Sequence, residues 1–365
     1  MSIRRLCADW ANFWLRSESP LGISLFRIVF GLIVLEWCLL LYPDLFNWFG
    51  MRGITSVQCS QQVLQALGPP GLNILSWMPP TDASIAIVFW LTTVAGIFLT
   101  LGLCTRMSAL AVYLGVAAFQ QQNCLIMNGG DILLKMTAFY LIFAASGNCL
   151  SLDSWFKRRR DPAQPPASNP VSGWPQQLFR FLIALIYFQA FWSKLEDPNW
   201  LNGSAIYFVL REHEFLRFPV AWIADSVWMC QTLTWGTLVI EGSMWALIWF
   251  KETRYWVLGG AVLLHLGIEY TMNLPVFESL MLAALIVFVP SNDLNFLFNR
   301  LRAAFAKADS TDSTILQAQS GHSVGTGVAG GVSTGMGVDT GVAGGVSTGM
   351  VVDTGVVGRT SPGAG

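Results

Sequence analysis

The chain consists of long apolar runs that short polar breaks separate. A helix needs about 20 mostly apolar residues to cross a bilayer, and about eight runs approach that length. These runs cover residues 22–42, 83–104, 108–127, 132–147, 177–192, 232–250, 255–272 and 276–290. Several are shorter than a full span, so one or two are candidates for tilted, paired or re-entrant segments. The pattern predicts an all-α integral membrane protein, a polytopic bundle of about eight transmembrane helices.

Two polar stretches divide this pattern. The sequence DPAQPPASNP, within a segment at about residues 157–175, is predicted to be a Pro-rich cytoplasmic linker between two membrane halves. Beyond residue 305, GVAGGVSTGMGVDT recurs almost unchanged as GVAGGVSTGMVVDT. Because this composition lacks the side chains that build a core, residues 306–365 are predicted to form a flexible, disordered tail, with a β-prone sticky segment as the alternative. Residues 1–305 then form the transmembrane domain.

The composition supports a membrane protein. Hydrophobic residues make up 53% of the 365 positions and charged residues only 12%, whereas soluble domains carry about 25% charged residues. The 16 Trp and 24 Phe are typical of a chain with aromatic rings at bilayer interfaces. The net charge of -1 gives no reason to expect nucleic acid, so the expected partner is the lipid bilayer. The 7 Cys form no CxxC pair, so we predict neither a metal site nor a disulfide framework.

Basic residues are distributed unevenly among the polar breaks. If the N-terminus is cytoplasmic and the number of spans is even, most Lys and Arg fall on the cytoplasmic side, including the KRRR block at 157–160. We therefore expect both termini in the cytoplasm and interpret this block as a topology anchor, with anionic-lipid binding as the alternative. Arg27, near the cytoplasmic end of the first run, is expected to snorkel to that surface.

Ionisable residues inside the apolar runs are the first functional candidates, because each is costly in a bilayer unless it is paired. Asp131 and Lys135 stand four positions apart, so they share a helix face and can neutralise each other. Asp131 also ends the sequence NGGD, which begins at Asn128, and is equally suited to cap the helix that follows. Both interpretations stay open.

A second group of ionisable residues lies in the later runs. Glu241 stands in the middle of a run, in VIEGSMW, where it needs a proton or a partner. His265 and Glu269, in LLHLGIEY, are again four positions apart and form either a proton relay or a polar pair between helices. One His with one carboxylate is too thin a ligand set to predict a metal.

Lys194 lies in FWSKLEDPNW, at the outer end of the fifth run. It is either a snorkelling residue that marks the end of a span or a base. A base must be neutral, and desolvation at a membrane boundary favours the neutral amine. Glu196 and Asp197 oppose this if they face Lys194, because a nearby carboxylate favours the ammonium.

Several stretches, taken in order, resemble a known family. They are SPLGISLFRIVFGLIVLEW, LGLCTRMSAL, MNGGDILLKMTAFYLIF, SLDSW, IYFQAFWSKLEDPNWLNGSAIYFVL and LLHLGIEYTMNLPVFESLMLAAL. Over about residues 19–290 the chain resembles the HTTM (horizontally transferred transmembrane) domain family, whose best-known member is the vitamin K-dependent γ-carboxylase. The stretch from Lys194 to Gly203 is the most specific part of the resemblance.

The resemblance implies a chemistry. In the carboxylase, the lysine that matches Lys194 deprotonates vitamin K hydroquinone, oxygen then yields a stronger base that removes the γ-proton of a glutamate, and carbon dioxide adds. A functional histidine of that enzyme matches His265. The implied cofactor is a reduced quinone like vitamin K hydroquinone, with oxygen and carbon dioxide as co-substrates. NGGD replaces a histidine-containing stretch of the carboxylase, and a Gly-rich tail replaces its large lumenal domain, so the substrate stays open.

The resulting prediction is a carboxylase-like enzyme of the bacterial inner membrane with Lys194 and His265 as catalytic residues. Its substrate is a small molecule or a protein on the outer side. Other side chains are expected to support the pocket: Asn128, Asp131, Lys135, Trp200, Glu241 and Glu269. The alternatives are a membrane transporter and a non-catalytic partner of the assembly or immunity type, in which the charged groups lie on separate helix faces.

Overall fold

Apolar helices make up most of the chain that the structure describes. The structure is a computed structural model, and it describes residues 3–54, 57–67, 71–161, 170–212, 214–218, 220–300 and 303. The predicted tail at 306–365 and most of the Pro-rich sequence, residues 162–169, lie outside the described residues. The flanks of the linker segment are regular, since residues 157–160 end a helix and residues 171–172 form a short strand.

The helical prediction is confirmed along the chain, because each apolar run lies largely in a helix. These helices are α2 (Leu21–Leu41), α5 (Asp82–Leu101), α6 (Thr105–Gln122), α7 (Gly129–Phe143), α9 (Trp174–Leu195), α13 (Val227–Ala246), α14 (Arg254–Thr271) and α15 (Phe277–Ala284), the last continued by η4 (Leu285–Phe288). Among the described residues, three segments are long and apolar enough to cross a membrane: Leu21–Phe49, Asp82–Leu101 and Trp174–Leu195. A fourth span results if Phe277–Phe288 and Ser291–Arg300, bent by 102°, form one. The number of spans, about eight, stays a prediction.

Shorter elements join these helices at their ends. They are α1 (Ile3–Leu15), β1 (Ser17–Glu18), η1 (Tyr42–Asp44), α3 (Leu45–Phe49), α4 (Val57–Leu67), η2 (Ile74–Trp77), η3 (Cys124–Ile126), α8 (Leu152–Arg160), β2 (Val171–Ser172), α10 (Pro198–Leu201), α11 (Ala205–Val209) and α12 (Ala221–Ala224). The two strands pair antiparallel, with Ser17 opposite Ser172 and Glu18 opposite Val171. This pairing ties the segment before α2 to the segment before α9.

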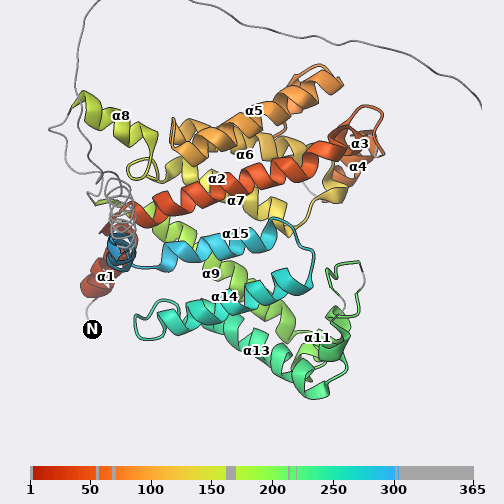
Figure 1. Ribbon diagram of the computed structural model, residues 1–365, viewed down its shortest axis with the longest axis vertical. Coiled ribbons are helices and arrows are strands. Elements are labelled where there is room, and N and C mark those ends of the chain that lie inside the picture. The colour runs from red at the N-terminus through yellow and green to blue at the C-terminus, as the bar shows by residue number, and fades with distance from the viewer. Residues whose placement is uncertain are drawn as a thin grey trace, which may run out of the picture. The chain divides into compact units, whose positions relative to one another are not determined.

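The long helices pack in two groups that meet along α2, α7 and α15 (Figure 1). In the first group α5 packs on α2 and α6, and α6 packs on α7. In the second group α13 packs on α9 and α14, and α14 packs on α15. Figure 1 shows α1 beside one end of α2, with α8 on the same side of the bundle, whereas α3 and α4 lie at the other end of α2. Because α2 runs the length of the bundle, it separates the polar elements into two ends.

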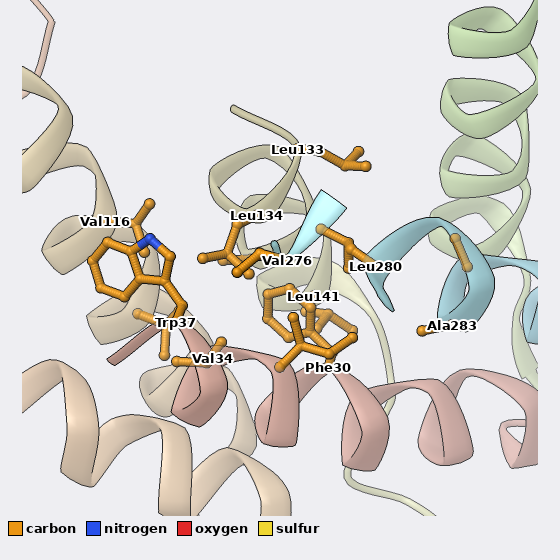
Figure 2. Packing of buried hydrophobic residues seen from close by; sticks show 14 of the residues in the cluster. Phe30, Val34, Trp37, Val116, Leu133, Leu134, Leu141, Val276, Leu280 and Ala283 are labelled. Carbon is orange, nitrogen blue, oxygen red and sulfur yellow. The ribbon is translucent and has the colours of Figure 1, made fainter. Parts of the chain in front are cut away.

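The core lies where α2 meets α6, α7 and α15 (Figure 2). Its buried side chains include Phe30, Val34 and Trp37 of α2, Val116 of α6, Leu134 and Leu141 of α7, and Leu280 of α15. Small residues bring the first helices close together. A Cβ on Gly31 would lie 2.7 Å from the backbone nitrogen of Thr100, so α2 and α5 are in backbone contact there. In a bilayer the hydrophobic effect does not drive helices together, because lipid tails are as apolar as the side chains. Helices there associate by close packing at small residues.

The outward faces of the helices are apolar, as a bilayer requires. Exposed Leu39 of α2, Leu91 of α5, Val239 of α13 and Leu263 of α14 point away from the core. An apolar outer face on several helices is unfavourable in water and favourable against acyl chains. Together with the long apolar helices, these faces indicate a membrane protein.

Arg27 does not snorkel, which corrects the expectation from its position near a helix end. Its side chain is fully buried and donates hydrogen bonds to the carbonyl oxygens of Leu99, at 2.8 Å, and Leu150, at 2.6 Å. These carbonyls belong to the last turn of α5 and to the segment before α8. A guanidinium with several donors in a fixed plane can satisfy two such carbonyls at once, so Arg27 fastens the end of α5 to α2.

Candidate functional site

Lys194, in the last turn of α9, forms a part-buried ion pair with Glu241 of α13. Its Nζ lies 2.8 Å from Glu241 Oε1, and the side chains are 21% and 9% exposed. The same Nζ donates to the carbonyl oxygen of Ala190 at 3.4 Å, which holds the ammonium against its own helix. A snorkelling lysine extends its ammonium to water, whereas this one points at a carboxylate inside the bundle.

The carboxylates next to Lys194 in the sequence have other partners. Glu196 accepts a hydrogen bond from Trp192 Nε1 at 3.0 Å. Asp197 caps the short helix α10 by accepting from the backbone nitrogen of Asn199 at 2.9 Å. The charge opposite Lys194 therefore comes from Glu241, which is distant in the sequence, and neither neighbouring carboxylate pairs with it in the described structure.

The residues after Lys194 fold back over it. The ring of Trp200 lies 5.0 Å from Lys194 Nζ, a distance at which an aromatic face attracts a cation. Gly203 follows with a positive φ of 83°, which favours glycine. Thr234 of α13 donates to the carbonyl oxygen of Gly203 at 3.2 Å, and Trp235 Nε1 donates to that of Leu201, also at 3.2 Å. These bonds hold Trp200 near Lys194.

A second cluster joins Tyr187 of α9, His265 of α14 and Glu278 of α15. The Tyr187 hydroxyl lies 2.5 Å from His265 Nε2, and Glu278 Oε2 lies 2.5 Å from His265 Nδ1. All three side chains are buried. An ionised carboxylate only accepts hydrogen bonds, so Glu278 assigns the proton to Nδ1, and Nε2 of a neutral ring then accepts from Tyr187.

The two clusters lie on one face of α9. Tyr187 and Lys194 are seven residues apart, which is two helical turns, or about 10 Å along the axis. Glu241 is close enough to interact electrostatically with both Lys194 and His265, and Tyr187 with both Glu241 and Glu278. Glu241 Oε2 and Glu278 Oε1 are buried and have no hydrogen-bond partner among the described atoms. Each of these oxygens can accept a hydrogen bond from a hydroxyl group of a ligand or from water.

Asn128 and Asp131 form a cap at the start of α7. The Asn128 side chain accepts from the backbone nitrogens of Gly130 and Asp131, and Asp131 Oδ2 accepts from the backbone nitrogen of Asn128 at 2.9 Å. Asp131 Oδ1 accepts from Trp37 Nε1 at 2.7 Å. The capping residue is therefore Asn128, and Asp131 completes a reciprocal capping box. Lys135 forms no ion pair within the described chain, so of the two interpretations of Asp131 the structure shows capping and not an ion pair with Lys135.

The NGGD sequence lies against the beginning of α15. A Cβ on Gly130 would lie 3.0 Å from the backbone nitrogen of Phe277, and one on Gly129 would lie 3.8 Å from the Phe277 ring. Val276, just before α15, has a positive φ of 70°, a conformation that is unfavourable for a β-branched residue. The start of α7 therefore fixes the position of the residue before Glu278.

Glu269 does not pair with His265, contrary to the prediction from their spacing. It forms an ion pair with Arg217 at 2.8 Å, and both side chains are about one-third exposed. A helical spacing of four places two side chains on one face but does not decide which neighbour each one contacts. The partner of His265 is Glu278, from the following helix.

Tyr187 and Glu278 are the site residues that the sequence analysis did not single out. Glu278 carries a usable signal, since it is an ionisable residue inside an apolar run. Tyr187 carries a weaker one, because a tyrosine is common in a membrane helix and only its spacing from Lys194 distinguishes it. Within the described residues, no group of three His, Cys, Asp or Glu side chains is placed to hold a metal ion.

Comparisons with known proteins match the chain to one family. The model of the HTTM domain matches residues 15–292. The curated protein "Uncharacterized protein YitO" from Bacillus subtilis (strain 168) is 26% identical over 132 residues, which is 34% of this chain and 42% of the relative. The match thus spans less than half of that relative's length. No solved structure matches the chain.

Proposed function

Because this chain belongs to the HTTM domain family, we propose that it is a carboxylase-like membrane enzyme in which Lys194 is a base that acts on a membrane quinol. The HTTM domain links the chain to vitamin K-dependent carboxylase-like membrane proteins. The observation that carries the proposal is the part-buried contact of 2.8 Å between Lys194 Nζ and Glu241 Oε1. A carboxylate beside a lysine inside the bundle can accept the proton of the ammonium group.

Glu241 makes Lys194 a base by accepting that proton. Moving one proton from Nζ to Oε1 converts an ammonium and a carboxylate into a neutral amine and a neutral acid. Burial penalises two charges more than two neutral groups, so this proton transfer costs less here than it would in water. The neutral amine of Lys194 then takes a proton from a bound hydroxyl, and Trp200 stabilises the ammonium that forms.

The residues around Lys194 fit a reduced quinone. When bound, such a cofactor supplies an acidic hydroxyl group and, with oxygen and carbon dioxide as co-substrates, the oxidising and carboxylating chemistry. Lys194 Nζ and the unpartnered Oε2 of Glu241 can hold that hydroxyl, and Trp200 offers an aromatic face beside them. The bilayer itself provides the route for an apolar cofactor.

The Tyr187–His265–Glu278 cluster holds a second proton. In the neutral state Glu278 keeps Nδ1 protonated, and Nε2 accepts from the Tyr187 hydroxyl. The ring can take up the proton that leaves Glu241 and become an imidazolium, which the Glu278 carboxylate stabilises. His265 acts in this way as a proton store beside the base, and Tyr187 and Glu278 position it.

Orientation and substrate belong to the same proposal. With α1 and α8 on the cytoplasmic side of a bacterial inner membrane, Lys194 opens to the outer side, where a small-molecule or protein substrate would be processed. Both termini are then cytoplasmic. Basic residues on α1 and on α8, including residues 157–160, support this orientation.

The test is turnover of a reduced quinone by purified protein. Wild type and Lys194→Ala are given reduced vitamin K and oxygen, and quinone epoxide is quantified. We expect epoxide from wild type and a loss of about 10²-fold or more in the variant, the usual contribution of a positioned base. Lys157→Ala, which removes an exposed lysine of α8, is the matched control and retains the wild-type rate. If wild type forms no epoxide, or if a folded Lys194→Ala forms as much, the proposal is wrong and a transporter or a non-catalytic partner replaces it.

A further inference from the structure

A large cavity lies at the other end of α9 from Lys194. Its volume is about 630 Å³, within the range of roughly 300–1,000 Å³ that small-molecule sites occupy. Arg180 of α9 lines it, fourteen residues before Lys194, which corresponds to about 21 Å along the helix axis. The cavity is therefore separate from the proposed catalytic site.

Among the residues that the structure describes, three guanidinium groups and one carboxylate, that of Glu18, line the cavity. Glu18 accepts from Arg180 at 2.8 Å and from Arg16 at 3.2 Å, so both of these arginines already have a counter-ion. Both oxygens of Glu18 are occupied by these contacts. Among the side chains that line the cavity, three positive charges face one negative charge, and the carboxylate of Asp293, next to lining residue Asn292, accepts a hydrogen bond from Tyr255.

Of the three lining arginines, Arg254 is the one that forms no ion pair with a described residue. It donates through Nε to the carbonyl oxygen of Ile248 at 3.3 Å and through one Nη to that of Trp249 at 3.4 Å. It forms no ion pair among the residues that the structure describes. The other Nη has no hydrogen bond to a described atom, so it is available to a ligand in the cavity. A guanidinium is suited to bind a phosphate through paired hydrogen bonds.

The wall next to Arg254 is aromatic. The rings of Phe13 and Trp249 lie 5.8 Å apart, and those of Trp249 and Phe288 lie 6.1 Å apart. All three residues line the cavity. An unpaired guanidinium beside an aromatic wall matches a ligand that combines an anionic group with an organic part.

We propose that this cavity binds an organic phosphate, with the phosphate group at Arg254 and the organic part along the Phe13–Trp249–Phe288 wall. The same chemistry belongs to a water-soluble phosphate ester and to the headgroup of an anionic phospholipid. The site goes beyond the proposed function, because Arg180 lies about 21 Å along α9 from Lys194.

Binding to the full chain, purified in a neutral detergent, tests the proposal. One arm titrates sn-glycerol 3-phosphate by calorimetry. The other measures by native mass spectrometry how much phosphatidylglycerol the protein retains, against phosphatidylcholine. Arg254→Gln is expected to weaken binding about tenfold or more, because a hydrogen bond between charged groups contributes roughly that factor. Asn292→Asp places a carboxylate in the cavity without removing any contact of Arg254 and is expected to have the same effect.

Lys251→Gln is the matched control, since it removes a highly exposed charge three residues before Arg254 and outside the cavity lining. It is expected to bind within about twofold of wild type. Binding in the calorimetric arm identifies a soluble ester, and selective retention of phosphatidylglycerol identifies a lipid headgroup; either supports the site. The proposal is overturned if neither probe binds, if both cavity variants bind like wild type, or if Lys251→Gln weakens binding as much as they do.

Discussion

At the scale of single residues, the two ring nitrogens of His265 have different partners, and this fixes what the ring can do. Glu278 lies at Nδ1 and the Tyr187 hydroxyl lies at Nε2, each at 2.5 Å. A carboxylate partner makes Nδ1 the protonated nitrogen of the neutral ring, so Nε2 is the position that gains or loses a proton. The side of the ring that exchanges protons is the side that faces Tyr187 and α9.

Glu278→Gln tests this assignment. An amide can donate or accept, so it no longer selects the tautomer of His265, and we expect quinol turnover to fall about 10²-fold. Tyr187→Phe removes one hydrogen bond and is expected to cost about 1 kcal/mol of stability. Rates over a pH series and ¹⁵N NMR of the His265 ring give the readout. A Glu278→Gln variant with the wild-type pH profile and the wild-type tautomer would reduce Glu278 to a packing residue.

The pKa of the Glu18 carboxyl depends more on its two arginine partners than on its burial. Burial alone would raise the pKa of the Glu18 carboxyl, but the guanidinium groups of Arg180 and Arg16 lower the pKa below its usual value of 4.5. Arg180 also donates to the carbonyl oxygen of Val287 at 2.6 Å, so Glu18 connects the strand before α2 to α9 and η4. The ionised form of Glu18 therefore stabilises this end of the bundle.

The lowered pKa predicts a pH dependence of stability. A carboxyl group with a lowered folded-state pKa contributes stability above its unfolded-state pKa, and this contribution is lost as pH falls through the folded-state pKa. We expect the Tm of the wild type to decrease as the pH drops below about 4.5. The Tm of Glu18→Gln is expected to be lower than that of the wild type at neutral pH and to change less in this acidic range. Thermal unfolding of both proteins from pH 7 to pH 3 provides the comparison. Parallel curves for the two proteins would show that Glu18 is not the group responsible.

At the scale of elements, the contact between the start of α7 and the start of α15 links two parts of the family resemblance. NGGD forms the cap of α7, and the same glycines allow Phe277 to approach. Glu278 follows Phe277 and holds His265. Asn128 and Asp131 therefore support the site through α15 and do not contact the reacting groups in the described structure.

The two glycines of NGGD provide a matched pair of substitutions. Gly130→Ala would place a Cβ 2.9 Å from Asn128 Oδ1 and 3.0 Å from the backbone nitrogen of Phe277, so the cap of α7 or the start of α15 must shift, and we expect a lower Tm and lower turnover. Gly129→Ala meets only the Phe277 ring at 3.8 Å, an ordinary contact, and we expect a Tm equal to or above that of wild type. Both variants are compared in thermal unfolding and in the quinol assay. Equal effects of the two substitutions would count against a close approach at Gly130.

The sequence predicts the elements far better than the contacts between them. Each apolar run is helical because a backbone in lipid must satisfy its own hydrogen bonds, and a helix does so locally. The partner of Glu241 or His265 depends instead on tertiary packing, which brings α13 to α9 and α15 to α14. For this reason the prediction that Glu241 needs a partner agrees with its ion pair to Lys194. The described structure forms neither the alternative Asp131–Lys135 pair nor the His265–Glu269 pair. Spacing within one helix identifies a shared face and not the neighbour that faces it.

At the scale of the whole membrane domain, the two ends of the bundle differ in chemistry. The end with α1 and α8 carries basic residues and the cavity beside Arg254, while the end with α3, α4 and the residues after α9 carries the Lys194 motif (Figure 1). The uneven charge predicts that the α1 end faces the cytoplasm. The base and the phosphate cavity would then open to opposite sides of the membrane.

Cysteine labelling tests this orientation. Two variants are made with a single cysteine each, one keeping Cys7 of α1 and one carrying Asn202→Cys, with all other cysteines replaced by alanine or serine; both positions are exposed. In spheroplasts, a membrane-impermeant maleimide is expected to label the Asn202→Cys protein, and to label Cys7 only after permeabilisation. The reverse pattern would place Lys194 on the cytoplasmic side and refute the predicted topology.

A double-mutant cycle on quinol turnover, with Lys194→Ala, Glu241→Gln and the double variant, shows whether Lys194 and Glu241 act together as one base. Glu241→Gln keeps a polar partner for Lys194 but cannot accept its proton. If the two residues act as one base, each single variant loses about 10²-fold or more, and the double variant is no slower than the worse single one. Losses that multiply in the double variant, or a Glu241→Gln protein that turns over quinol at the wild-type rate, would contradict the account.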